Sequence, residues 1–301
     1  MSNSRNKLLN DVDASMLWQA IKEATAQKTY ALKINLDRVP SVFDSKVGGL
    51  PYWDLNVPIP RTSDGKKMAL LAQLNMADYP DNDLLPKEGM LQFFIGASDV
   101  YGLNFDDQTL QEGFRVVFHE EIDRSFSSES IKGEFILPHD SDDDDLPIAS
   151  EYALDVEQKV AYMFHDDYRF DGAIKSAAQS IGLRNRPEYA NLTDKEFYRI
   201  LWDSLEPIFD ENEESYEFVM SGSRVLGYPF FTQSDPREVQ GKYSGYDILL
   251  LQLDSEDRKL SDDSYDWMVM WGDCGVGNFF IRKEDLLNKD FSHVLYNWDC
   301  F

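Results

Sequence analysis

The chain has 301 residues, of which 43% are hydrophobic and 13% aromatic, and its 55 Asp and Glu against 29 Lys and Arg give a net charge of -26. A chain of this length and composition can bury a large core, which excludes a disordered domain. An acidic surface repels phosphate backbones and anionic lipids, so the charge argues against nucleic-acid and membrane binding. A basic protein is the partner that this charge favours.

The sequence also predicts a compartment. No apolar run approaches the roughly 20 residues that cross a bilayer, and the start MSNSRNKLLNDVD lacks the apolar segment of a secretory signal. We therefore expect a cytoplasmic protein. The cysteines, Cys274 and Cys300, are too few for a disulfide framework and too far apart for a CxxC pair, so we expect reduced thiols.

The first part of the chain reads as one helix followed by strands. Residues 15–27 carry apolar side chains at helical spacing, and residues 29–39 alternate apolar and polar side chains as a half-buried strand does. Short apolar runs bounded by Gly, Pro, Asn or Asp predict further strands at 68–75, 90–96 and 114–122.

An acidic stretch at 139–147 is followed by a region, 151 to about 215, that we predict to be mainly helical. Its clearest helix follows Thr193 and Glu196, which form a capping box, and Pro207 should end or kink this helix. The last third returns to strand-like runs at 246–254, 266–273 and 277–286, before a short helical stretch at 284–290 and a terminal segment at 294–301.

Two loops nearly repeat one another, SKVGGLPYW at 45–53 and SRVLGYPFF at 223–231. Their downstream segments match in the same order, LLAQLN with LLLQLD and GMLQFFI with GVGNFFI. We predict an α+β fold with an internal duplication, giving two related, largely antiparallel halves, 1–150 and 223–301. A mainly helical insert, 151–222, separates them, and helices also occur at the N-terminus. We expect one compact unit over 1–301.

The repeated residues suit structural roles. The glycines permit positive φ or close approach, the prolines fix the chain direction and the aromatic residues anchor each loop in the core. Each buried glutamine should hydrogen-bond the backbone of its own loop. Because the set occurs twice, it indicates scaffold and not catalysis. The residues are Gly49, Pro51, Trp53 and Gln73 in the first copy and Gly227, Pro229, Phe231 and Gln252 in the second.

These same motifs, together with GDCGVGNFFI and the closing WDC, resemble the YwqG-like family of bacterial proteins over most of the chain. The resemblance implies a cytosolic, mixed α and β protein without an assigned activity, and it transfers no catalytic residue. The second copy departs from the first where Leu226 stands in the place of Gly48.

Three sequence patterns are typical of chemical or binding sites, and for each we favour a structural interpretation. WGDCGVGNFF resembles a phosphate loop but lies between strand-like segments, so we predict a hairpin. Cys274 lies beside Asp273, which raises a thiol pKa and argues against a nucleophile. Asp140, Asp142, Asp144 and Glu151 have calcium-loop spacing, but Asp145 takes the place of the required glycine, so we expect a solvated acidic loop and no metal site.

His119 and Glu121 could share one face of a strand, where a carboxylate would orient the imidazole and raise its pKa. The favoured hypothesis is nevertheless a non-catalytic acidic module that binds a basic protein, in an antitoxin or immunity role, with no cofactor. The alternative is an enzyme or small-ligand binder that uses the cleft between the halves, with the polar set His119, Glu121, Asp273 and Cys274.

Overall fold

The structure is a computed structural model that describes residues 9–140, 146–211, 221–238 and 241–301. Its contacts divide the chain into two units. The helical unit comprises Met1–Lys28, Val160–Ser221 and Gly227–Phe230, and the sheet unit comprises Thr29–Lys159, Gly222–Leu226 and Phe231–Phe301. The longest described helices lie in one unit and most of the antiparallel strands in the other, which confirms the α+β class. The division into 1–150, 151–222 and 223–301 stays a prediction.

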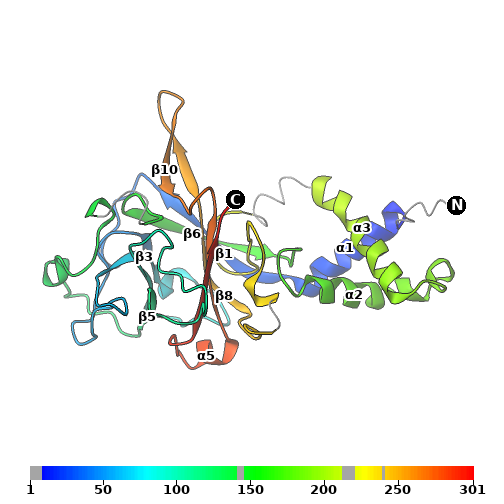
Figure 1. Cartoon of the computed structure of the whole chain (residues 1–301), viewed down its shortest axis with the longest axis horizontal. Helices are drawn as coiled ribbons and strands as arrows, with labels where there is room; N and C mark the ends of the chain where they lie inside the picture. Colours follow the sequence, from blue (N-terminus) through cyan, green and yellow to red (C-terminus); the bar gives the residue numbers. More distant parts are fainter. Residues whose placement is uncertain (1–8, 141–145, 212–220, 239–240) are drawn as a thin grey trace. The chain divides into compact units, whose positions relative to one another are not determined.

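The helical unit contains α1 (Asp11–Thr25), α2 (Phe170–Ser180) and α3 (Asp194–Glu211), which pack side by side (Figure 1). The 3-10 turns η4 (Leu183–Asn185) and η5 (Pro187–Tyr189) join α2 to α3. Helix α1 begins earlier than predicted because Asn10 caps it, its side chain accepting a hydrogen bond from the Asp13 N–H at 2.9 Å. Leu17 and Ile21 are fully buried on the predicted face of α1.

The predicted capping box of α3 is present. The backbone N–H and the hydroxyl of Thr193 donate to Glu196 Oε2 at 2.9 and 2.7 Å, and the Glu196 N–H donates back to Thr193 Oγ1 at 3.3 Å. Pro207 lies inside α3 and the helix continues to Glu211, so the proline does not end it. Within the described residues, no helix combines the length and apolarity needed to cross a bilayer.

The sheet unit is built on a ten-stranded sheet in the order β12-β11-β8-β7-β1-β6-β2-β3-β4-β5, and every strand pair with a described register is antiparallel. The strands on one side and in the centre are β1 (Gln27–Asn35), β2 (Lys46–Val47), β3 (Met68–Asn75), β4 (Met90–Gly96), β5 (Phe114–His119) and β6 (Tyr152–Ala161). The other side contributes β7 (Arg224–Leu226), β8 (Ile248–Asp254), β11 (Val276–Ile281) and β12 (Val294–Asp299).

Smaller elements decorate this sheet. A hairpin of β9 (Glu256–Lys259) and β10 (Tyr265–Val269) projects from the unit (Figure 1). The short helices are η1 (Met76–Asp78), η2 (Ser128–Ile131), η3 (Pro138–Asp140), η6 (Pro236–Glu238) and α5 (Lys283–Leu287).

Strand β6 corrects the prediction of helix from residue 151 onward. Tyr152, Ala153 and Leu154 are buried where β6 pairs with β2, but the following residues are mostly exposed and polar. The usual period-two alternation is therefore missing from most of the strand, which is why its sequence does not read as β.

Aromatic side chains fill the core of the sheet unit. The ring of Phe279 in β11 lies 4.9 Å from that of Phe93 in β4 and 4.5 Å from that of Tyr296 in β12. Strands β4 and β11 lie near opposite ends of the sheet order, so the sheet curls until both ends face one core. All three rings are buried.

Candidate functional site

The first glycine loop, residues 45–53, leaves the short strand β2 through two residues with positive φ. Gly48 has φ +68° and Gly49 has φ +75°. A Cβ atom on Gly49 would lie 2.2 Å from Glu151 Oε1, so the position requires glycine for space as well as for conformation. The second glycine loop, residues 223–231, has the same two left-handed residues, Leu226 at +59° and Gly227 at +80°.

Gln73, in β3, holds the first loop in place. Its Oε1 accepts from the Tyr52 N–H at 2.8 Å, which is the predicted bond to its own loop. Its Nε2 donates to the carbonyls of Val42 and Asp44 at 3.0 and 2.9 Å, so the segment before the loop is fixed as well. The fully buried amide thus joins three stretches of backbone.

Gln252, in β8, is also fully buried, and its Nε2 donates to the Gly222 carbonyl at 2.8 Å, immediately before the second loop. Both loops bury their prolines, Pro51 and Pro229, and their aromatic anchors. Trp53 packs edge-on against Phe94 with ring centroids 5.8 Å apart, and Phe231 stacks on Phe280 at 6.1 Å.

A buried ion pair lies beneath the first loop. Lys46 Nζ is fully enclosed and lies 2.7 Å from Glu151 Oε1, and it also donates to the Leu50 carbonyl at 2.5 Å. Burial lowers the pKa of Lys46, and the nearby Glu151 carboxylate acts against this shift. The Glu151 side chain keeps 37% of its surface exposed. The lysine therefore fixes a carboxylate whose outer side remains open to solvent.

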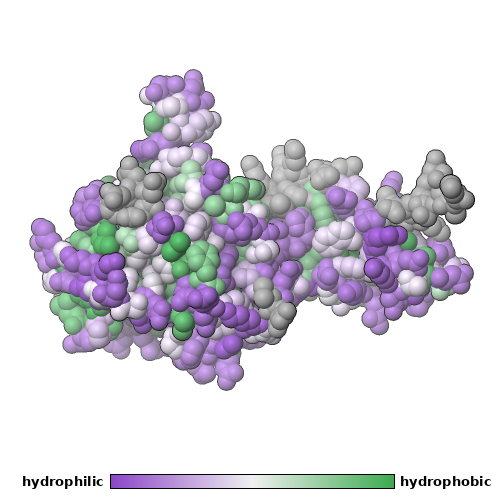
Figure 2. Space-filling model, viewed as in Figure 1, coloured by the Kyte–Doolittle hydropathy of each residue, from purple (hydrophilic) through white to green (hydrophobic). Residues whose placement is uncertain are grey.

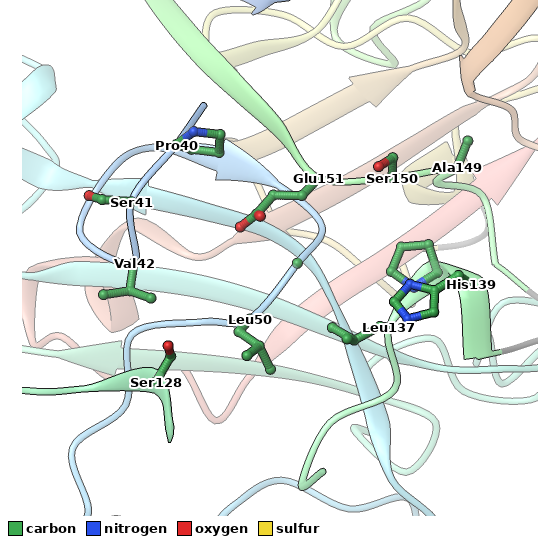
Figure 3. Close-up of a pocket in the computed structure, with 12 residues that line it drawn as sticks. Pro40, Ser41, Val42, Leu50, Ser128, Leu137, His139, Ala149, Ser150 and Glu151 are labelled. Atoms are coloured by element: carbon green, nitrogen blue, oxygen red, sulfur yellow. The ribbon is translucent and has the colours of Figure 1, made fainter. Parts of the chain in front are cut away.

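This carboxylate lies on the wall of a pocket of about 520 Å³, here termed the glycine-loop pocket (Figure 3). Val42, Leu50 and Leu137 supply apolar surface. Ser41, Ser128, His139 and Glu151 supply polar groups. Figure 3 shows the Glu151 side chain extending from the start of β6 toward the glycine loop. The volume lies in the range of small-molecule sites.

The structure describes two of the four calcium-loop residues, Asp140 and Glu151, so the prediction for this loop stays untested. Asp142 and Asp144 lie outside the described residues. Asp140 ends η3 and accepts from the Leu137 N–H at 3.3 Å, and Glu151 pairs with Lys46. Asp285, Asp290 and His293 instead form a group whose possible ligand atoms lie within 4.8 Å of one another. These three could hold a cation, although Asp290 and His293 are exposed.

His119 occupies a different environment from the predicted one. Its ring is buried between Tyr52 and Trp53, with centroids 5.4 and 4.9 Å away, and burial lowers its pKa to about 4. The predicted carboxylate would have raised it. His119 Nε2 lies 3.1 Å from Gln92 Oε1. Because both N–H bonds of Gln92 are donated, to Gln73 Oε1 and the Tyr52 carbonyl, the neutral imidazole must be the donor.

Two further members of the polar set lie elsewhere. Asp273 and the exposed Cys274 belong to a turn near Tyr101, whose hydroxyl accepts from the Gly272 N–H at 3.3 Å. Tyr101 follows one end of β4, whereas His119 pairs with Met90 at the other end. Among the described residues, no contact joins His119 or Glu121 to Asp273 or Cys274. The turn leads from β10 to β11, which belong to different sheets, so the predicted hairpin is wrong.

Glu121 is exposed beyond β5 and lines a second hollow of about 630 Å³, here termed the acidic groove. Four leucines contribute to its lining: Leu84, Leu85, Leu286 and Leu287. Four carboxylates surround them: Asp83, Glu88, Glu120 and Glu121. Of its two lysines, Lys289 pairs with Glu120 and Lys87 donates to the Asn82 carbonyl. The groove combines apolar surface with a negative rim.

Sequence reasoning missed Lys46 and Gln92. A lysine in a short polar-looking segment gives no sign of full burial, so Lys46 had no usable signal. Gln92 did have one, because it interrupts an apolar strand as Gln73 does and aligns with Asn278 in the second copy.

Comparison with known proteins gives one family match. The family model described as Domain of unknown function (DUF1963) matches residues 45–300. This range includes both glycine loops, the pocket carboxylate and the acidic groove. No curated protein matches the chain.

Proposed function

The chain belongs to the DUF1963 family of domains of unknown function, and from its own geometry we propose that it is a non-catalytic module that binds a basic segment of another protein in the acidic groove. An antitoxin or immunity protein that neutralises a basic partner is one form of such a module. The observation that carries this proposal is the combination, in one hollow, of the exposed Leu287 and the half-buried Leu84, which lie over the buried Leu85 and Leu286, with four carboxylates.

The chemistry of the groove defines the segment that fits it. Leu287 is 59% exposed and offers apolar surface to a partner side chain. The carboxylates outnumber the lysines of the lining, and both lysines already have acceptors. A segment with alternating leucine and lysine residues would therefore bury its leucines in the groove and place its ammonium groups at the rim.

The charge of the whole protein favours the same partner. A net charge of -26 attracts a cation over distances of about 10 Å at 0.1 M salt, beyond the groove itself. Figure 2 shows one face of the molecule, on which hydrophilic residues predominate over smaller hydrophobic patches. The association rate should fall steeply as salt is added.

The direct test is a titration with two peptides, one of alternating leucine and lysine residues and one with glutamine in place of each lysine. The lysine peptide should bind at least about tenfold more tightly at low salt, and the difference should shrink as salt rises. The variant Glu88→Lys with Glu121→Lys should lose this preference.

The matched control is Asp99→Lys with Glu129→Lys, which changes the net charge equally at exposed positions outside the groove. Binding retained by the control and lost by the groove variant supports the proposal. If both variants weaken binding equally, only the overall charge matters and the groove is not the site. Where only the groove variant loses binding, capture of a partner from lysate would identify what the groove binds.

We propose three further properties of the module. The two halves of the sheet arose by internal duplication, since Lys46 lies opposite Gln73 and Gln73 opposite Gln92, as Arg224 lies opposite Gln252 and Gln252 opposite Asn278. Within its family the chain is YwqG-like, as its loop motifs suggest. Its compartment is the cytoplasm, where Cys274 and Cys300, which are free thiols here, would stay reduced.

A further inference from the structure

The glycine-loop pocket is separate from the acidic groove, with which it shares no lining residue among those described. Its volume of about 520 Å³ lies in the range of small-molecule sites. It forms where the glycine loop, the segment 40–42 and the start of β6 meet η2 and η3.

The Glu151 carboxylate in this pocket is held in a fixed orientation. Lys46 Nζ bonds Oε1 from beneath at 2.7 Å, and the missing side chain of Gly49 lets the carboxylate lie against the loop. A carboxylate offers about four acceptor positions, and Lys46 takes one of them. With 37% of its side chain exposed, Glu151 still has acceptor capacity for a ligand.

The second glycine loop shows that this carboxylate is not part of the shared framework. In the antiparallel register of β2 with β6, Val47 lies opposite Tyr152, and continuing this register by one residue places Glu151 opposite Gly48. In the register of β7 with β1, the residue opposite Leu226 is Thr29. Thr29 is fully buried, and its hydroxyl donates within the sheet, with the carbonyls of Leu226 and Val225 3.0 and 3.3 Å away. The same backbone therefore forms without a carboxylate.

The lining selects a class of ligand. Lys46 is enclosed behind the carboxylate, and the described lining holds no lysine or arginine, only the imidazole of His139, so an anionic group would face the open side of Glu151 without a lysine or arginine to pair with. A guanidinium group prefers both oxygens of a carboxylate, and Lys46 already uses Oε1. An ammonium group needs only one oxygen of the carboxylate, and Ser41 and Ser128 add hydroxyl acceptors to the same lining.

We propose that the glycine-loop pocket binds a small primary amine. Its ammonium group donates to Glu151, and its apolar body packs on Val42, Leu50 and Leu137. Lys46 and Gly49 are positioning residues, because they act on the ligand only through the carboxylate.

The test compares phenethylamine with 2-phenylethanol, which has the same ring and chain but no charge, by ligand-observed NMR titration of the full chain. The parent protein should bind the amine at least about tenfold more tightly than the alcohol. Glu151→Gln retains an acceptor for Lys46 and should reduce this preference to about one. Leu137→Trp, which fills the pocket without touching the ion pair, should abolish binding of both compounds.

Glu129→Gln is the control, because it removes an exposed carboxylate that pairs with Lys132 outside the pocket. It should bind both compounds as the parent does. Circular dichroism establishes that each variant is folded. Equal binding of amine and alcohol by the parent chain, no binding of the amine, or a preference that survives Glu151→Gln would each overturn the proposal.

Discussion

The glycine loop at 45–53 and the loop at 223–231 leave the sheet in the same way. Each follows a short strand and passes through two successive residues with positive φ. Each strand also carries a buried cation, Lys46 or Arg224, opposite a buried glutamine of the next strand. Burial lowers the pKa of both cations, that of Arg224 to about 10. The two loops therefore share their backbone conformation and the burial of one cation and one glutamine.

The loops differ in the side chains that surround this framework. Glu151 faces the first loop, whereas Thr29 occupies the matching position beside the second. At the edge strands, His119 packs on the aromatic anchors of the first loop, while the Asp299 carboxylate accepts from the Thr232 N–H at 3.1 Å. One framework thus supports two environments, and a pocket with an exposed carboxylate forms at the first loop.

Leu226 shows that glycine is not required wherever φ is positive. A left-handed residue with a side chain costs about 1–2 kcal/mol, and full burial of a leucine contributes about 1.5–3 kcal/mol. Leu226 is 6% exposed, so its burial can offset its backbone conformation. At Gly48 a Cβ would lie 2.4 Å from the Ser150 carbonyl oxygen. A side chain would therefore clash there, and its burial could not offset the cost of the left-handed conformation.

The largest effect should come from removing the glutamine of the shared framework. Gln73→Leu keeps the size of the side chain but leaves the Tyr52 N–H and the Val42 and Asp44 carbonyls without their partner. At about 1–3 kcal/mol for each buried group, partly relieved by relaxation, we expect about 4 kcal/mol of destabilisation in urea unfolding.

The control for this loss is Gln19→Leu, which changes an exposed glutamine of α1 that bonds Glu23 at 2.8 Å. It should change the free energy of unfolding by less than about 0.5 kcal/mol. A similar, small effect at Gln73 would contradict the view that this amide fixes the loop.

The second-largest effect should be a pH dependence of the free energy of unfolding that comes from His119, beside the first loop. In the folded chain burial lowers the pKa of His119 to about 4 from its ordinary 6.5, so the native state resists protonation. This contribution is fully present above pH 6.5 and is lost as the pH falls through 4. The shift corresponds to about 3 kcal/mol. Urea unfolding between pH 7 and pH 4 should show that His119→Gln loses less stability than the parent.

Acidic side chains titrate in both proteins, so the difference between the two pH profiles isolates the histidine. The glutamine amide can still donate to Gln92 Oε1 in place of the imidazole. Parallel profiles over this range would mean that His119 is protonated as readily in the folded chain as in the unfolded chain.

Gly49 tests the close approach that distinguishes the first loop. Gly49→Ala adds a Cβ 2.2 Å from Glu151 Oε1, whereas Gly133→Ala adds one at a similar φ of +76° with nothing within 4 Å. In both variants an alanine adopts a left-handed conformation, which costs about 1 kcal/mol, and only Gly49→Ala also displaces the Glu151 carboxylate. We expect Gly49→Ala to be the more destabilising by about 2 kcal/mol in urea unfolding.

A double-mutant cycle with Glu151→Ala assigns this difference to the carboxylate. In that background the excess cost of Gly49→Ala over Gly133→Ala should largely disappear. An excess that is unchanged without the carboxylate would show that the backbone alone requires glycine at residue 49.

The sequence predicts the framework well because its signals are local and repeated. Short apolar runs bounded by turn residues locate β3, β4 and β8, and the match of the two loops identifies Gln73 as a residue that bonds its own loop. These features follow from nearby residues and from the pattern of apolar residues, and both can be read from the sequence itself.

The pocket could not be predicted in the same way. Lys46 and Glu151 are 105 residues apart and meet only because β2 pairs with β6, a strand that reads as polar. For His119 and Glu121 the sequence predicted a contact that the structure does not show. Their spacing would place both on one face of a strand, but β5 ends at His119 and the chain turns away before Glu121. A strand pairing distant in sequence decided the first outcome, and the end of β5 decided the second.

The smallest effect should come from the pocket carboxylate itself. Glu151→Gln removes a charge but keeps an oxygen that can accept from Lys46, and the side chain is more than a third exposed. An ion pair with one solvated partner contributes little, so we expect about 1 kcal/mol of destabilisation in urea unfolding. Glu151→Ala should cost more, because the buried ammonium then keeps only the Leu50 carbonyl among the partners described. A loss in Glu151→Gln as large as that in Gln73→Leu would assign the carboxylate to the framework, and the difference between the two loops would then concern stability and not a ligand.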